Sequence, residues 1–267
     1  MLGKRLPIFA GVMRSWRWSL LGWAAALAAV PAIYAGFWPA MGGGEVMQEL
    51  VSSMPESLVI AFGFDAMASA AGYLQAAVYG MCGLALLLVF AISAGARLIA
   101  GEEENGTLEL ELAHPVARRA VLGQRMGALA VSSALLVAVV AAVTMVMVTA
   151  LALEITLSAV MATATGLFLL VLGFGLIALA VGAAMGRYRI AAGTAAGLAV
   201  ASFIADAVAP LVTWGHWLEV ISPISWYMGS DPLSTGWHLP GLGALAGISV
   251  VAIVVALVAF NRRDLGV

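Results

Sequence analysis

The sequence predicts an all-α integral membrane protein with six transmembrane helices. Of its 267 residues, 63% are hydrophobic and only 10% are charged. This composition leaves too little polar surface to enclose a water-soluble core. The apolar runs are also far longer than the roughly 10 residues of a barrel strand, and in lipid each run must satisfy its own backbone hydrogen bonds. Helices are therefore expected throughout.

The six expected spans each approach the ~20 residues that a bilayer requires. They cover Leu20–Trp38, Leu74–Ala96, Met126–Ala152, Ala159–Met185, Ile190–Val212 and Gly241–Phe260. Short connections at Glu154 and at Gly186–Arg189 predict that the third, fourth and fifth spans are successive antiparallel neighbours.

The basic residues predict the orientation of these spans. All twelve fall on one side of the arrangement: Lys4, Arg5, Arg14, Arg17, Arg97, Arg118, Arg119, Arg125, Arg187, Arg189, Arg262 and Arg263. Positive charge is retained on the cytoplasmic side during insertion. Both termini are therefore expected in the cytoplasm, and the segments 39–73, 153–158 and 213–240 are expected outside.

Shorter helices are expected next to the spans. Residues 1–19 mix Ile8, Val12 and Trp16 with Arg14 and Arg17, which is typical of an amphipathic N-terminal helix lying along the inner membrane surface. The alternative is a frayed basic tail. Short outer helices are expected within Glu45–Phe64 and Glu219–Met228.

Several chemistries are absent from the sequence. Lys4 is the single lysine and lies in no glycine-rich context, so no phosphate-binding loop of the G-x-x-x-x-G-K-[ST] type exists. The chain lacks H-E-x-x-H, C-x-x-C and G-x-S-x-G motifs, and its three histidines fall on opposite sides of the membrane. These observations argue against an ATPase, a metal site and a lipid-handling membrane enzyme.

The segment 97–125 is the most charged part of the chain and is expected in the cytoplasm. Glu102 to Glu104 lead into Asn105 and Gly106, which favour a turn. Leucines then alternate with Glu109 and Glu111, a strand-like pattern, but a lone strand at a bilayer surface would have two unpaired edges. We therefore expect a short helix that ends before Pro115, followed by a second helix that continues into the third span.

This segment resembles permease subunits of the ABC type-2 exporter family, which carry a G-E-E-x-x-G-T-L-E-L-x-L-A-x-P-V-x-R stretch between their second and third spans. The matching residues are Gly101, Glu102, Glu103, Gly106, Thr107, Leu108, Glu109, Leu110, Leu112, Ala113, Pro115, Val116 and Arg118. Glu104, and Glu111 where these proteins often have leucine, are interpreted as variable positions. The C-terminal Phe260–Leu265 stretch, F-N-R-R-D-L, is also similar to the end of such permeases.

The resemblance implies that the cytoplasmic stretch is a coupling helix, which docks into a separate ATPase subunit. The chain itself is then no enzyme and holds no cofactor, while two copies of the partner ATPase bind ATP and magnesium. A second permease copy, a homodimer in preference to a heterodimer, and membrane lipid are the other expected partners, and no nucleic acid is expected. The expected location is a bacterial cytoplasmic (inner) membrane. Without the resemblance, the same charges would be interpreted as a solvated loop.

Asp206 is the one acid well within an expected span. An acid at that depth indicates a substrate or ion path, or an interhelical hydrogen bond. The alternative is that it reaches the outer interface and is hydrated, because Pro210 close by can kink or end the helix. Two functions stay open: an exporter permease for an apolar or amphipathic small molecule or lipid, and a self-sufficient secondary transporter or channel that uses Asp206.

Overall fold

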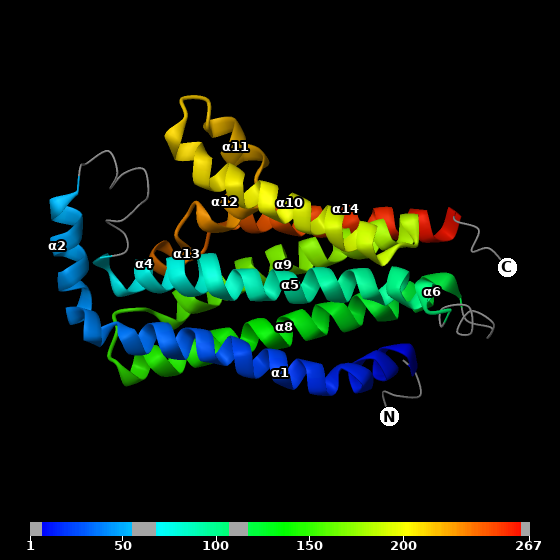
Figure 1. The fold of residues 1–267 in the computed structure, drawn as a ribbon, viewed down its shortest axis with the longest axis horizontal. Coiled ribbons are helices and arrows are strands. Elements are labelled where there is room, and N and C mark those ends of the chain that lie inside the picture. Colours follow the sequence, from blue (N-terminus) through cyan, green and yellow to red (C-terminus); the bar gives the residue numbers. More distant parts are fainter. Residues whose placement is uncertain (1–6, 55–67, 107–116, 263–267) are drawn as a thin grey trace.

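The protein is a bundle of long helices. The structure, a computed structural model, describes residues 7–54, 68–106 and 117–262, and all regular elements within these ranges are helical (Figure 1). Six stretches in the described ranges are long and apolar enough to cross a membrane: Pro7–Gly42, Ala70–Glu104, Arg118–Ala150, Leu157–Met185, Tyr188–Leu211 and Leu239–Arg262. The prediction of an all-α protein with six spans is confirmed.

The individual elements follow the chain in a simple order. The long helices are α1 (Pro7–Phe37), α5 (Gly83–Ala96), α8 (Arg118–Ala150), α9 (Leu157–Met185), α10 (Tyr188–Val208) and α14 (Leu239–Arg262). The shorter elements are η2 (Pro39–Gly44), α2 (Glu45–Ser53), α4 (Ala70–Leu74), η4 (Gln75–Cys82), η5 (Arg97–Gly101), α6 (Glu102–Glu104), η6 (Ala209–Leu211), α11 (His216–Ile221), α12 (Pro223–Met228) and α13 (Pro232–Thr235).

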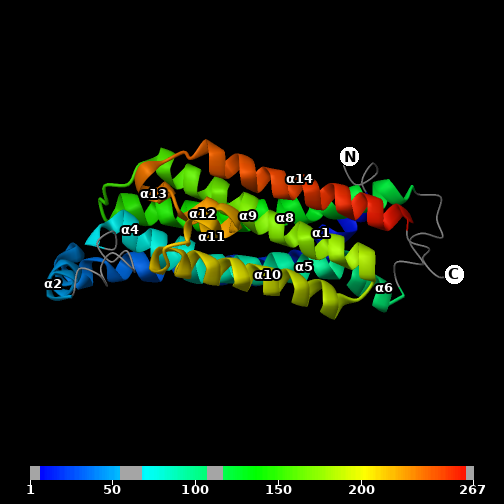
Figure 2. The same cartoon turned by 90° about the horizontal axis from the view of Figure 1, so that it is seen from above.

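The bundle is elongated and its two ends differ (Figures 1 and 2). α1 begins and α14 ends at the end that also carries α6, whereas α2 and α13 lie at the opposite end (Figure 1). The described arginines belong to the first of these ends, which we call the basic end. Six spans bring the start of α1 and the end of α14 to the same side, in agreement with the charge pattern.

Helix α9 forms the centre of the bundle. It packs against α14, α5, α10 and α8, and α1 packs against α8 on the outside. Thr156 caps the start of α9 by accepting a hydrogen bond from the N–H of Ala159, and Gly186 ends the helix with a left-handed φ of 65°. The short connections on either side of α9 make α8, α9 and α10 antiparallel neighbours, as predicted.

The N-terminal helix and the first span form one element. Residues 7–18 are helical, as expected, but α1 runs without interruption from Pro7 to Phe37. Val12, Met13 and Trp16 pack against the buried core, so this part of the chain lies along the bundle instead of forming a separate surface helix. The apolar side of the amphipathic pattern is therefore covered by protein. Residues 1–6 lie outside the described ranges.

The second span is longer than expected and contains two π-helical segments. It consists of α4, η4, α5, η5 and α6 in direct succession, and both η4 and η5 are π-helical. π-helical segments inside α-helices are rare and occur frequently at functional sites.

The outer helix expected over Glu219–Met228 is two helices. α11 ends at Ile221 and α12 begins at Pro223, with the Ser222 side chain accepting a hydrogen bond from the N–H of Ser225. Proline favours the first helical turn, where its missing N–H costs no hydrogen bond, and this agrees with the start of α12 at Pro223. Of the other expected outer helix, residues 45–53 form α2, and residues 55–64 lie outside the described ranges.

Candidate functional site

The predicted turn at the basic end is present in the structure. Gly106 has a left-handed φ of 69°, a conformation that suits glycine, and its N–H donates to the carbonyl of Glu103. Gly101 is buried, and Glu102 and Glu103 are half-buried in α6. Arg118 is the first residue of α8. Thr107, Leu108, Glu109, Leu110, Leu112 and Pro115 lie outside the described residues.

Glu104 has a structural role that the sequence did not reveal. Its carboxylate Oε1 accepts a hydrogen bond of 3.0 Å from the backbone N–H of Tyr188, the first residue of α10. Negative charge at a helix N-terminus is favourable because the first N–H groups lack partners within the helix. Glu104, interpreted above as a variable position, therefore joins the end of the second span to the start of α10.

A cavity of about 440 Å³ opens beside this junction at the basic end. Its walls come from the first turns of α1, from η5 and α6, and from α8. The polar side chains in its wall are Ser15, Arg97, Glu102 and Arg125, of which Arg125 is buried with 1% exposure. The buried Arg125 places charge between α1 and the end of the second span.

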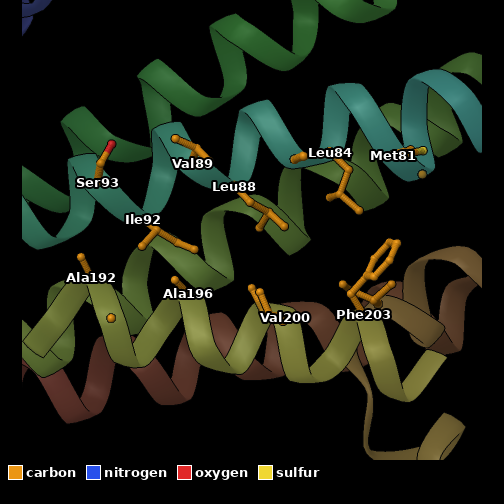
Figure 3. Close-up of a pocket in the computed structure, with 15 residues that line it drawn as sticks. Met81, Leu84, Leu88, Val89, Ile92, Ser93, Ala192, Ala196, Val200 and Phe203 are labelled. Carbon is orange, nitrogen blue, oxygen red and sulfur yellow. The ribbon is translucent and has the colours of Figure 1, made fainter. Parts of the chain in front are cut away.

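A second and larger space is an apolar groove of about 690 Å³ between the second span and α10. Figure 3 shows Leu84, Leu88 and Ile92 directed from α5 toward α10, which contributes Ala196 and Val200. Ser93 also lines the groove, but its hydroxyl donates to the carbonyl of Phe90 in its own helix. The groove therefore presents a hydrocarbon-like surface with almost no groups for polar recognition.

Asp206 lies beyond the end of this groove that is far from the basic end. It follows the groove residue Phe203 by one helical turn, and it is half-buried. Its Oδ1 accepts a hydrogen bond of 2.7 Å from the hydroxyl of Ser225 in α12. The Ser222 hydroxyl donates in parallel to the carbonyl of Ser202, at 2.9 Å. The interhelical hydrogen bond predicted as one role for Asp206 is present, and it fastens α12 to α10.

A buried polar network joins α12 and α13 to η4 of the second span. The Tyr79 hydroxyl donates to Thr144 at 3.0 Å, and the Tyr227 hydroxyl donates to the carbonyl of Tyr79 at 3.4 Å. Gln75 accepts from the N–H of Leu233 at 3.2 Å. Burial raises the pKa of Tyr227 well above its ordinary value of 10, so the hydroxyl keeps its proton. These residues lie in unremarkable apolar sequence, and their partners are distant along the chain.

The histidines and acidic residues of the described ranges are spread over several elements of the fold. No group of three or more His, Cys, Asp or Glu side chains that could hold a metal ion occurs among them. His216 lies 3.8 Å from Glu219 in the exposed α11, and His238 lines a small pocket near Tyr227. The features with functional potential are therefore the apolar groove, Asp206 and the junction at the basic end.

Comparison with known proteins gives one family over nearly the whole chain. The sequence model described as ABC-2 family transporter protein matches residues 12–265. The match runs from the first turns of α1 to beyond the end of α14. No curated protein matches the chain.

Proposed function

The chain belongs to the ABC-2 family of transporter proteins, whose membrane permease domain lacks ATPase activity itself, and from this premise we propose that it is the membrane-spanning subunit of an ATP-driven exporter. Its substrate would be an apolar or amphipathic small molecule or a lipid, taken from the cytoplasm or the inner leaflet. The apolar groove between the second span and α10 carries this proposal. A wall of aliphatic side chains can accept hydrocarbon groups of many shapes and cannot select by hydrogen bonds.

Energy would come from a separate ATPase with bound ATP and magnesium. The coupling site would consist of Gly101, Glu102, Glu103, Gly106, Thr107, Leu108, Glu109, Leu110, Leu112, Pro115 and Arg118, at the basic end, which is then cytoplasmic. Leucines with charged residues on both sides suit a protein interface with an apolar centre and a polar rim. A bacterial inner membrane with both termini in the cytoplasm fits the charge pattern.

A second copy of the chain would complete the transporter, with one ATPase for each copy. α10 supports this part of the proposal because much of its surface is exposed in the single chain, including Val200, Phe203 and Ile204. A Cβ added to Gly193 or Gly197, on the same helix, would meet no atom within 4 Å. Close packing within the described part of the chain therefore does not require glycine at these two positions. Small residues permit close helix approach in lipid.

The first test is co-purification of the chain with a candidate ATPase in detergent, followed by ATP hydrolysis with and without the permease. A stable complex with permease-dependent hydrolysis is the expected result. A chain that purifies alone, binds no ATPase and still moves ions in liposomes would contradict the proposal and favour the secondary transporter.

Asp206 separates the two functions. As part of the outer end of a translocation path in an ATP-driven permease, Asp206 needs only to accept the Ser225 hydrogen bond, so Asp206→Asn should retain transport. Asp206→Leu should lower the stability of the α10–α12 contact by about 0.6 kcal/mol, the average for interhelical hydrogen bonds in a membrane protein, with about 1.7 kcal/mol as the upper bound. A secondary transporter that protonates Asp206 would instead lose all activity in Asp206→Asn. Transport assays on both variants in liposomes, with Ser225→Ala as the matched partner variant, distinguish these outcomes.

A further inference from the structure

Two consecutive residues near the start of α8 bind two different helices. The Gln124 side-chain oxygen accepts hydrogen bonds from the backbone N–H groups of Ile8 at 3.1 Å and Phe9 at 3.2 Å, in α1. Arg125 donates from Nη1 to the carbonyl of Leu98 in η5. Both residues lie at the end of the 97–125 segment, where it continues into the third span.

Gln124 acts as a helix cap supplied by another helix. The first N–H groups of a helix have no partner within it, and Pro7 has no N–H to offer. The N–H groups of Ile8 and Phe9 are therefore the first two donors of the described part of α1, and a single carboxamide oxygen accepts both. The two donors also identify the atom as the oxygen of the amide, because its nitrogen could not accept.

Arg125 joins α8 to the second span, in this case as a hydrogen-bond donor. Its side chain is buried, and Leu98 lies within the π-helical η5. Inside a membrane protein a buried guanidinium is costly unless backbone carbonyls or other polar groups receive its donors. The Leu98 carbonyl lies in the last turns before α6, so Arg125 joins α8 to the part of the chain that leads into the predicted coupling turn.

Side chains next to these contacts continue the α1–α8 junction along the bundle. A Cβ added to Gly127 would lie 3.9 Å from the Phe9 ring, and the Ser132 hydroxyl donates to the Met13 sulfur at 3.5 Å. The first turns of α1 are thus held along more than two turns of α8.

We infer that Gln124 and Arg125 form a clamp that makes the start of α1 and the end of the second span move together with α8. The purpose of the clamp depends on the proposed function. A displacement of the coupling segment would be transmitted through α8 to α1 and to the end of the second span together. Gln124 is a positioning residue for α1, and Arg125 is a positioning residue for the second span. Neither residue contacts the transported molecule in this role.

The test of Gln124 uses a cross-linking reporter. In a Cys82→Ser background, which removes the single cysteine of the chain, Met13→Cys and Ser132→Cys place thiols on facing turns of α1 and α8, where a short bifunctional thiol reagent can join them. Gln124→Leu should lower the rate of cross-linking between α1 and α8 about fivefold, the size expected from loss of a helix cap. Gln124→Glu keeps an oxygen acceptor at the N-terminus of α1 and should cross-link like the parent.

A functional measurement distinguishes the clamp from simple structural support. In the complex with the ATPase, Gln124→Leu should reduce permease-dependent ATP hydrolysis, and cross-linking the cysteines introduced at positions 13 and 132 should restore it. Equal cross-linking in Gln124→Leu and the parent, or no restoration by the cross-link, would overturn the role of Gln124. If no ATPase binds even to the parent, the proposed function fails, while the cross-linking comparison still decides whether Gln124 holds α1.

Arg125 has its own reporter at the second span. A Cβ added to Gly182 in α9 would lie 3.4 Å from the Ala100 Cβ in η5, so Ala100→Cys with Gly182→Cys reports the position of the π segment. Arg125→Leu should slow this cross-link, whereas Gln124→Leu should leave it unchanged. An unchanged rate in Arg125→Leu would overturn the second half of the clamp. Elution of each variant as a single peak in size-exclusion chromatography shows that it has folded.

Discussion

Gly95→Ala should destabilise the protein more than any other single-methyl addition that we propose. Gly95 in α5 faces Gly175 in α9, and a Cβ at Gly95 would lie 2.0 Å from the Gly175 carbonyl oxygen. Carbon–oxygen contacts between helices normally lie at about 3.3–3.6 Å. The two backbones would have to separate at the centre of the bundle. We expect a loss of about 3 kcal/mol, at the upper end of the usual cost of overpacking.

The measurement is thermal unfolding in detergent, followed by size-exclusion chromatography. A loss of that size corresponds to a fall in Tm of about 6–12 °C for a chain of this length. Gly243→Ala is the matched control, because it also lies in a span and an added Cβ meets no atom within 4 Å. Equal Tm values for Gly95→Ala and Gly243→Ala would show that α5 and α9 do not touch at this point.

Leu108→Asp should abolish most of the binding to the ATPase. Within the proposed coupling segment, Leu108 supplies part of an apolar centre, and a carboxylate there would have to lose its hydration when the partner docks. Interface hot spots contribute about 2 kcal/mol or more, which corresponds to roughly 30-fold weaker binding. Glu102→Ala should have a smaller effect in the same direction. Co-purification and the affinity of the detergent-solubilised permease for the ATPase measure both variants.

Membrane insertion separates a docking defect from a folding defect. Leu108 lies between the second and third spans and Glu102 lies in α6, at the end of the second span, so both variants should reach the membrane, and Leu108→Asp should keep the Tm of the parent. Glu111→Leu is the control, because the resemblance places leucine at this position in many such permeases. Unchanged association and transport in both Glu102→Ala and Leu108→Asp would refute the coupling role.

The sequence predicted the number and type of the elements because each span is a long apolar run. Their ends were less accurate where the helix continues beyond the bilayer. The second span covers Ala70–Glu104 where Leu74–Ala96 was expected, whereas the helix predicted to lead from near Pro115 into the third span is present as the start of α8 at Arg118. The N-terminal helix was predicted, but its fusion with the first span was not. Amphipathic sequence cannot distinguish a face covered by lipid from one covered by α8.

Local patterns also predicted part of the candidate site. The turn at Asn105 and Gly106 follows from the chemistry of those two residues. Glu104, Gln124 and Arg125 were missed because their partners lie 84, 116 and 27 residues away along the chain. Hydrogen bonds between distant helices leave no periodic signal, and Arg125 was interpreted only as a marker of the cytoplasmic side.

The two π-helical segments of the second span alter how sequence position relates to helix face. In an α-helix each residue advances the face by about 100°, so residues three or four apart share a side. A π segment accommodates extra residues within a turn, and this spacing does not hold across Gln75–Cys82 or Arg97–Gly101. The direction in which Leu84, Leu88 and Ile92 point therefore depends on the number of residues in the π-helical segment before them as well as on their side-chain types. Removing a single residue between Gln75 and Cys82 would turn the apolar wall away from α10 without changing its composition.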